Sequence, residues 1–144
     1  AAIAALLGSA IGWERDRAGK SVGPRTMALV GASAAAIVNI GHILGENAQF
    51  GDPTRAMHAI ITGIGFLGAG LIFQTRDSGT KGVTTAATVF ATAAMGCAVG
   101  LGFQIASIGL TIIILIVLRS THMLEITANQ TRTTFRCSDF LNFY

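Results

Sequence analysis

Charge is what this chain has least of. Charged residues make up 12% of its 144 residues, which is about half the usual share. Hydrophobic residues make up 51%, and the mean hydropathy is +0.62. The few charges cluster in short segments, and the runs between them are long enough to cross a bilayer, which takes about 20 apolar residues. The sequence therefore predicts a polytopic membrane protein and not a soluble domain of the same length.

Cysteine and the other residues of catalytic or metal sites are also sparse. Cys97 lies in a predicted membrane span and Cys137 in a polar tail, so we expect the two thiols at different depths and not in a disulfide. Their spacing to histidine and acidic residues matches no metal motif. The sequence shows no nucleophile–base pair and no phosphate-binding loop. We therefore predict no catalytic residue, no metal site and no cofactor, and a protein that is not an enzyme.

The basic residues are few and unevenly placed. An isoelectric point near 9.4 invites a nucleic-acid role, but these residues lie beside the apolar runs and form no stripe with interleaved aromatics. We therefore expect a lipid bilayer and no nucleic acid as the partner. With five spans, one side of the membrane receives nine basic residues: Arg15, Arg17, Lys20, Arg25, Arg76, Lys81, Arg119, Arg132 and Arg136. The other side receives only Arg55, which predicts a cytoplasmic C-terminus and an external N-terminus.

Five apolar runs are predicted as transmembrane helices. They cover residues 1–13, 26–44, 56–75, 84–101 and 103–118. The first is about 20 Å long as a helix, too short to span, so we expect it to be the remainder of a longer helix. The last is rich in bulky aliphatic residues and is expected to face lipid at the edge of the bundle. The predicted fold class is an all-α membrane bundle of about five helices over residues 1–118, followed by a cytoplasmic tail over residues 119–144.

Short polar segments are predicted to connect these helices. Residues 14–25 are charged and contain glycine and proline, which is typical of a loop. Asp52 is predicted to cap the third helix, with Pro53 at its first position. Gly102 is predicted to form the turn between the last two helices, and residues 133–136 are typical of a first strand.

A glycine-rich stretch lies in the middle of the uncharged run 56–75. At about 100° per residue, Gly63 and Gly70 fall on one side of a helix, and Gly65 and Gly68 fall on the opposite side. Small residues let membrane helices approach closely, so we predict that this helix packs on two faces and is the centre of the bundle. The same glycines match a dinucleotide-binding fingerprint. That motif needs a preceding strand and an acidic residue about 20 positions later, so packing is the favoured interpretation.

Two polar clusters are candidates for function, because ionisable groups at membrane depth are expensive and usually functional. The inner cluster contains Glu14, Arg15, Asp16, Arg17 and Arg25, with Thr26, Thr84 and Thr85. The outer cluster contains Asp52, Arg55 and Glu46, with Asn39, His42 and His58 as weaker candidates. Alternatives stay open for each: topogenic or headgroup-binding charge for the arginines, a helix cap for Asp52, and amphipathic filling of the interface for the histidines, which could otherwise sense acid.

Five motifs resemble those of one family, in the order in which that family has them. They are GWER at 12–15, GPRTMALVGA at 23–32, DPTR at 52–55, TGIGFLGAG at 62–70 and GVTTAAT at 82–88. The chain resembles the MgtC/SapB membrane proteins from its first residue to about Arg119. It departs from the common pattern of the family at Pro24, Ala59, Thr84 and Ala91. The resemblance therefore supports the fold more strongly than it supports the virulence-associated roles.

The resemblance implies a bacterial inner-membrane bundle that is usually followed by a cytoplasmic ACT-like domain, of which residues 119–144 would be only the start. It also implies roles in growth under magnesium limitation and in acid or host-cell survival, and restraint of the F-type ATP synthase. We weigh two hypotheses: a regulatory protein that binds copies of itself or other membrane proteins, and a transporter or channel subunit for magnesium or protons. Transport activity in liposomes would discriminate between them.

Overall fold

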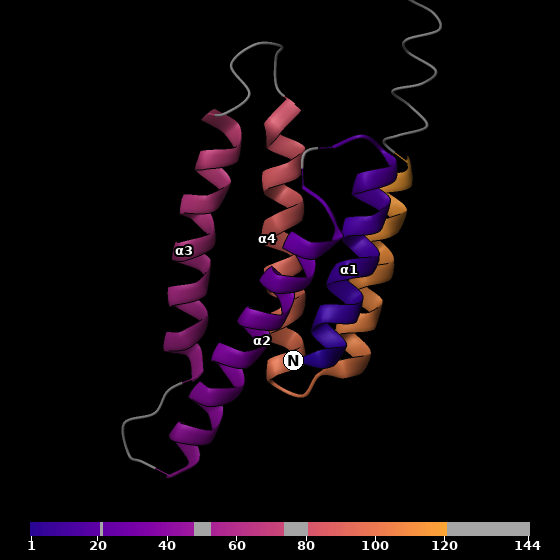
Figure 1. Cartoon of the computed structure of the whole chain (residues 1–144). Coiled ribbons are helices and arrows are strands. Elements are labelled where there is room, and N and C mark those ends of the chain that lie inside the picture. Colours follow the sequence, from indigo (N-terminus) through magenta and orange to yellow (C-terminus); the bar gives the residue numbers. More distant parts are fainter. Residues whose placement is uncertain (21, 48–52, 74–80, 121–144) are drawn as a thin grey trace, which may run out of the picture.

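Five helices make up the part of the chain that the computed structural model describes, which is residues 1–20, 22–47, 53–73 and 81–120. They are α1 (Ala2–Arg17), α2 (Pro24–Asn47), α3 (Pro53–Phe73), α4 (Lys81–Gly100) and, unlabelled in Figure 1, the helix Gln104–Ser120, called here the 104–120 helix. Successive helices run in opposite directions, and no strand occurs in these ranges. The predicted all-α class and the number of helices are confirmed. The strand expected at 133–136 lies outside the described residues.

Three helices contain stretches long and apolar enough to cross a membrane: Pro24–Gly45, Thr54–Ile72 and Gly82–Gly100. The 104–120 helix is apolar but shorter, about 25 Å long at 1.5 Å per residue. The helix ends gather at two ends of the bundle (Figure 1). We call the end where α1 finishes and α2 and α4 begin the inner end, and the opposite end the outer end, after the orientation predicted from the basic residues.

The charged residues 14–17 belong to α1 and not to a loop, so the predicted start of that loop is wrong. Glutamate and arginine are strong helix formers, and the helix ends at Arg17, two residues before Gly19, whose φ of +63° suits glycine. The helix end is closed in a Schellman arrangement, in which the Gly19 amide donates to the Asp16 carbonyl at 3.0 Å. Pro24, also predicted in the loop, is the first residue of α2, where its missing N–H and fixed φ are suitable.

α3 lies at the edge of the bundle (Figure 1), so its prediction as the central helix is wrong. Only 11% of its spanning stretch is buried inside the structure, against 56% for α4. A Cβ atom added at Gly63, Gly65 or Gly70 would meet nothing within 4 Å, and one at Gly68 would meet only the Ala86 Cβ at 3.6 Å. Among the glycines of α3, only Gly68 therefore faces another described helix, which is α4, and α4 is much more deeply buried than α3.

Two other glycine pairs, each spaced four residues apart, make close helix contacts. On α1, a Cβ at Gly8 would lie 2.5 Å from the Met27 carbonyl oxygen of α2, and Gly12 is packed as closely on Pro24. On α4, Gly96 lies against the Gly31 carbonyl oxygen and Gly100 against that of Ala35, where a Cβ would be 2.7 Å away. Such spacing puts both small residues on one helix face and lets backbones touch. α2 is thus held between α1 and α4.

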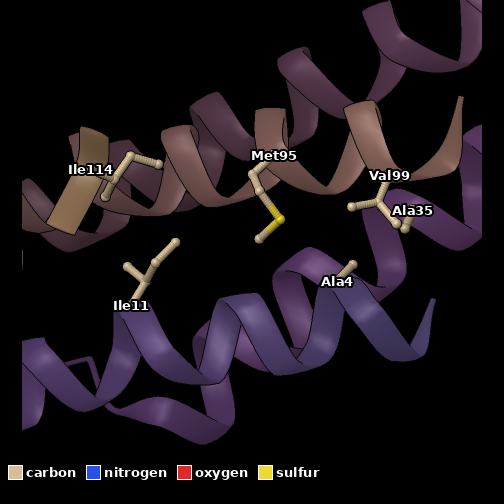
Figure 2. Close-up of a cluster of buried hydrophobic side chains, with 6 residues drawn as sticks. All are labelled: Ala4, Ile11, Ala35, Met95, Val99 and Ile114. Atoms are coloured by element: carbon tan, nitrogen blue, oxygen red, sulfur yellow. The ribbon is translucent and has the colours of Figure 1, made fainter. Parts of the chain in front are cut away.

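A cluster of buried side chains joins four helices next to these contacts. Figure 2 shows its members, which are Ala4, Ile11, Ala35, Met95, Val99 and Ile114. Ile114, on the 104–120 helix, is only 8% exposed, which corrects the expectation that this aliphatic helix only faces lipid. Its other face, with Ile112, Ile113 and Ile116, is exposed as predicted. The turn before this helix is at Gly102, as predicted, with φ of +86°.

Candidate functional site

Arg15 is the one charged residue among the buried side chains of the described ranges, with 3% of its surface exposed. It is carried into the bundle at the inner end by the last turn of α1, because that helix extends beyond the apolar run. Its Nη2 group donates a 2.5 Å hydrogen bond to Oγ1 of Thr85, which is itself 2% exposed and lies in the first turns of α4. This hydrogen bond joins α1 to α4 through two residues that are 70 positions apart in the sequence.

The buried hydroxyls of α4 continue from Thr85 toward the outer end. Thr88 donates to the Thr84 carbonyl at 2.7 Å, and Thr92 donates to the Thr88 carbonyl at 2.8 Å. Thr92 also lies 3.5 Å from the sulfur of Met27 on α2. Hydroxyls bonded to the carbonyl one turn earlier are satisfied within their own helix. This column can therefore pack against α2 in an apolar environment without exposing unmatched hydroxyl groups.

The structure brings only two of the inner candidates together, namely Arg15 and Thr85. Arg25, Thr26 and Thr84 are exposed, and Glu14 is half-buried. These residues are therefore at the surface of the inner end. Next to them Arg17 lies over the ring of Trp13, 5.8 Å from its centroid, a distance at which a cation–π attraction operates. Exposed groups of this kind are suited to lipid headgroups or to a partner at the membrane surface.

The outer candidates are on two helices. Asn39 of α2 lies 3.5 Å from the Gly100 carbonyl through its Nδ2 group, which links α2 to the end of α4. His42 on the same helix, and Arg55 and His58 on α3, are exposed. Asp52 lies outside the described residues. Within the described ranges, no three histidine, cysteine or acidic side chains are grouped so that they could hold a metal ion.

Four buried hydroxyls were not among the candidates predicted from the sequence: those of Thr88 and Thr92 on α4, described above, and those of Ser107 and Thr111. Ser107 and Thr111 of the 104–120 helix are 0% and 4% exposed. Ser107 donates to the Gln104 carbonyl at 2.7 Å, and Thr111 donates to the Ser107 carbonyl at 2.8 Å. Their spacing of four residues in an otherwise aliphatic helix was a readable signal that this face is turned toward the bundle.

Comparison with known proteins decides which family this bundle represents. The family model described as MgtC family matches residues 2–126. The chain belongs to the MgtC family. No solved structure matches it.

Relatives of this MgtC-family chain occur in distant bacteria. It is 38% identical to Protein SrpB of Synechococcus elongatus, over 74% of this chain and 65% of SrpB. It is 35% identical to YhiD of Escherichia coli K12, whose name describes it provisionally as a magnesium transporter, over 85% of this chain and 59% of YhiD. It is 40% identical to Protein MgtC of Brucella abortus, over 67% of this chain and 39% of that protein. The chain thus covers less than two thirds of each of these relatives.

Proposed function

We propose that this MgtC-family protein is a non-enzymatic, multi-pass protein of the bacterial inner membrane that acts by binding another membrane protein, or a second copy of itself, through α3. The observation that carries the proposal is the open face of α3. Gly63 and Gly70 have no atom of the chain within 4 Å of a would-be Cβ, and Phe66, between them on the helix surface, is 82% exposed.

Such a face is suited to another helix because membrane helices associate by close packing and not by a hydrophobic force. Each glycine in a helix interior costs about 1 kcal/mol against alanine in water, and no contact with the described residues offsets that cost at Gly63 or Gly70. A partner helix that approached within backbone distance would offset it. The resemblance to the family links such binding to magnesium limitation, to acid or host stress and to the F-type ATP synthase, which we propose as the setting of this interaction.

Photocrosslinking from α3 tests the proposal. A photoreactive phenylalanine analogue at Phe66 should crosslink to a protein in native membranes, and the crosslinked species should be lost when Gly63 or Gly70 is changed to leucine. The matched control carries the analogue at Ile113, which is 60% exposed on the 104–120 helix. Crosslinking at Phe66 that is no stronger than at Ile113, or that survives both leucine variants, would remove α3 as the binding surface.

The orientation in the membrane is part of the same proposal. We place the C-terminus in the cytoplasm because nine basic residues fall on one side and one on the other. A reporter that is active only in the cytoplasm, fused after Ser120, should be active. A reporter that is active only after export should stay silent at the same position, and activity of that second reporter would reverse the orientation.

Transport of magnesium or protons is the second candidate, favoured by the name of the relative YhiD. The three stretches long enough to cross a membrane contain no aspartate or glutamate, whose carboxylates are the protein ligands that magnesium prefers, and this favours binding over transport. Purified protein in liposomes loaded with a magnesium- or pH-sensitive dye gives the answer. A flux above that of empty liposomes would establish transport.

A further inference from the structure

An apolar groove opens between α3 and α4 toward the outer end of the bundle. At the inner end the two helices touch, since a Cβ added at Gly82 would lie 2.6 Å from the Leu71 carbonyl oxygen. One turn further along, at Gly68 and Ala86, the contact has relaxed to 3.6 Å. Beyond that point, toward the outer end, residues of both helices line a space of about 390 Å³. The groove is thus a wedge that is closed at its inner tip.

The walls of the groove contain hydrophobic residues only. Ile61 and Ile64 come from α3, and Ala94 and Ala98 come from α4. Phe103, just before the 104–120 helix, and Ala106, in its first turn, line its outer part. The wall segments belong to stretches of α3 and α4 that are apolar and long enough to span a membrane, so the medium beside them is hydrocarbon.

We propose that this groove binds an acyl chain of a bilayer lipid. A void in an apolar wall loses the dispersion contacts of its lining, and lipid tails are as apolar as leucine, so an acyl chain restores those contacts without burying a polar group. A chain of methylene carbons is only one carbon wide, about 4 Å at contact distance. The groove is also more than twice the size of a cavity of about 150 Å³ that holds benzene.

The shape of the groove argues against a protein helix as its occupant. A helix is about 10 Å or more in diameter, and it would have to leave the wedge where α3 and α4 meet at Gly82, whereas a flexible chain can end there. The groove and the proposed function are independent, because Gly63 and Gly70 are not among its wall residues.

Labelling with a photoreactive lipid tests the proposal on the full chain. The protein is placed in nanodiscs of phosphatidylethanolamine and phosphatidylglycerol with a minor fraction of phosphatidylcholine that carries a diazirine within one acyl chain. After irradiation, the labelled residues are mapped by mass spectrometry. Adducts should concentrate on the facing walls of α3 and α4. They should exceed those on the lipid-exposed face of the 104–120 helix, at Ile113 and Ile116.

A matched pair of variants separates a bound chain from ordinary surrounding lipid. Ala94→Phe fills the groove, whereas Ala87→Phe puts the same side chain on the same face of α4 two turns away, at an exposed position outside the groove. Groove labelling should fall to the level of the 104–120 helix in Ala94→Phe and stay unchanged in Ala87→Phe. Ala98→Leu serves as a smaller filling variant if Ala94→Phe does not fold.

Three outcomes would overturn the proposal. Even labelling of all lipid-exposed faces of the wild-type chain would show surrounding lipid only. Unchanged groove labelling in a folded Ala94→Phe or Ala98→Leu variant would show that the label does not come from inside the groove. Groove labelling that declines as the number of protein copies per nanodisc rises would show that a second copy occupies this surface in place of lipid.

Discussion

Gly96 and Gly63 test which glycine-bearing helix holds the bundle together. Gly96→Ala puts a methyl group against the Gly31 carbonyl oxygen, 3.0 Å from the Ala34 Cβ and 3.1 Å from the Gly31 carbonyl carbon. Two of these three atoms belong to the α2 backbone, which cannot rotate away, so α2 and α4 must move apart. Overpacking of this kind costs about 1–3 kcal/mol, and the better helix propensity of alanine returns up to about 1 kcal/mol.

The net loss expected for Gly96→Ala against wild type is therefore about 0–2 kcal/mol, which lowers the folded-to-unfolded ratio by a factor of up to about 30. The propensity gain is common to Gly96→Ala and Gly63→Ala, so the two variants should differ by the full overpacking cost of about 1–3 kcal/mol. Gly63→Ala has only the propensity gain, because nothing lies within 4 Å of its added Cβ. The stability of both variants is measured by unfolding in mixed micelles of a mild detergent and dodecyl sulfate. Circular dichroism follows the unfolding, at protein dilutions that keep single chains apart. If Gly96→Ala is as stable as Gly63→Ala, the α2–α4 contact is not what holds this bundle together.

Three further changes are expected to have distinct effects in the same unfolding assay. Thr85→Val removes the hydroxyl that accepts a hydrogen bond from buried Arg15 and should lower the free energy of unfolding by about 1–3 kcal/mol. Thr85→Ser should stay near wild type, and equal stability of the two variants would show that this hydrogen bond contributes nothing. Ile114→Ala should cost about 2–5 kcal/mol because its side chain is buried, while Ile113→Ala on the exposed face should be mild; matched values would mean that this helix does not dock through Ile114. In Gly102→Ala the new alanine must adopt a positive φ, which should lower the stability by about 1–2 kcal/mol. Unchanged stability would mean that the turn can adopt another backbone conformation.

The number and approximate limits of the helices could be predicted from the sequence because they follow from apolar length. The run 56–75 is uncharged and becomes α3, and Pro53 is its first residue as predicted. The ends of helices were harder to predict where they carry charged residues. Residues 14–17 are charged because they leave the apolar run, and charge alone does not distinguish a helix that extends beyond the run from a loop.

The arrangement of the helices could not be predicted in the same way. A dense set of glycines shows where a close approach is possible, and the four glycines of α3 indicated a centre that the structure puts elsewhere. The pairs Gly8/Gly12 and Gly96/Gly100 were more informative, because two small residues that are four positions apart lie on the same face of a helix and make it flat. Which surfaces meet still depends on shape complementarity along whole helices, which the spacing of one helix does not contain.

The residues of the candidate site were predicted from the sequence, but the sequence did not show which of them meet. The sequence identified Arg15 and Thr85 within a larger inner cluster, and the structure pairs these two while leaving Arg25 and Thr84 at the surface. The two neighbours Thr84 and Thr85 point in directions about 100° apart on a helix. The sequence alone does not show which direction faces α1, because that depends on the rotation of α4 within the bundle.

The position of α2 between α1 and α4 has a consequence for biosynthesis. Gly31 and Gly96, which meet in the folded bundle, are separated by 65 positions, and α3 must be made and moved aside before they can meet. At about 5–20 residues per second, α2 therefore waits about 3–13 s in the membrane with one face covered by α1 and the other open. We expect nascent chains stalled after α2 has left the ribosome, and before α4 has left it, to contain a docked α1–α2 pair already. Their open α2 face would then be the surface available to insertion factors until α4 arrives.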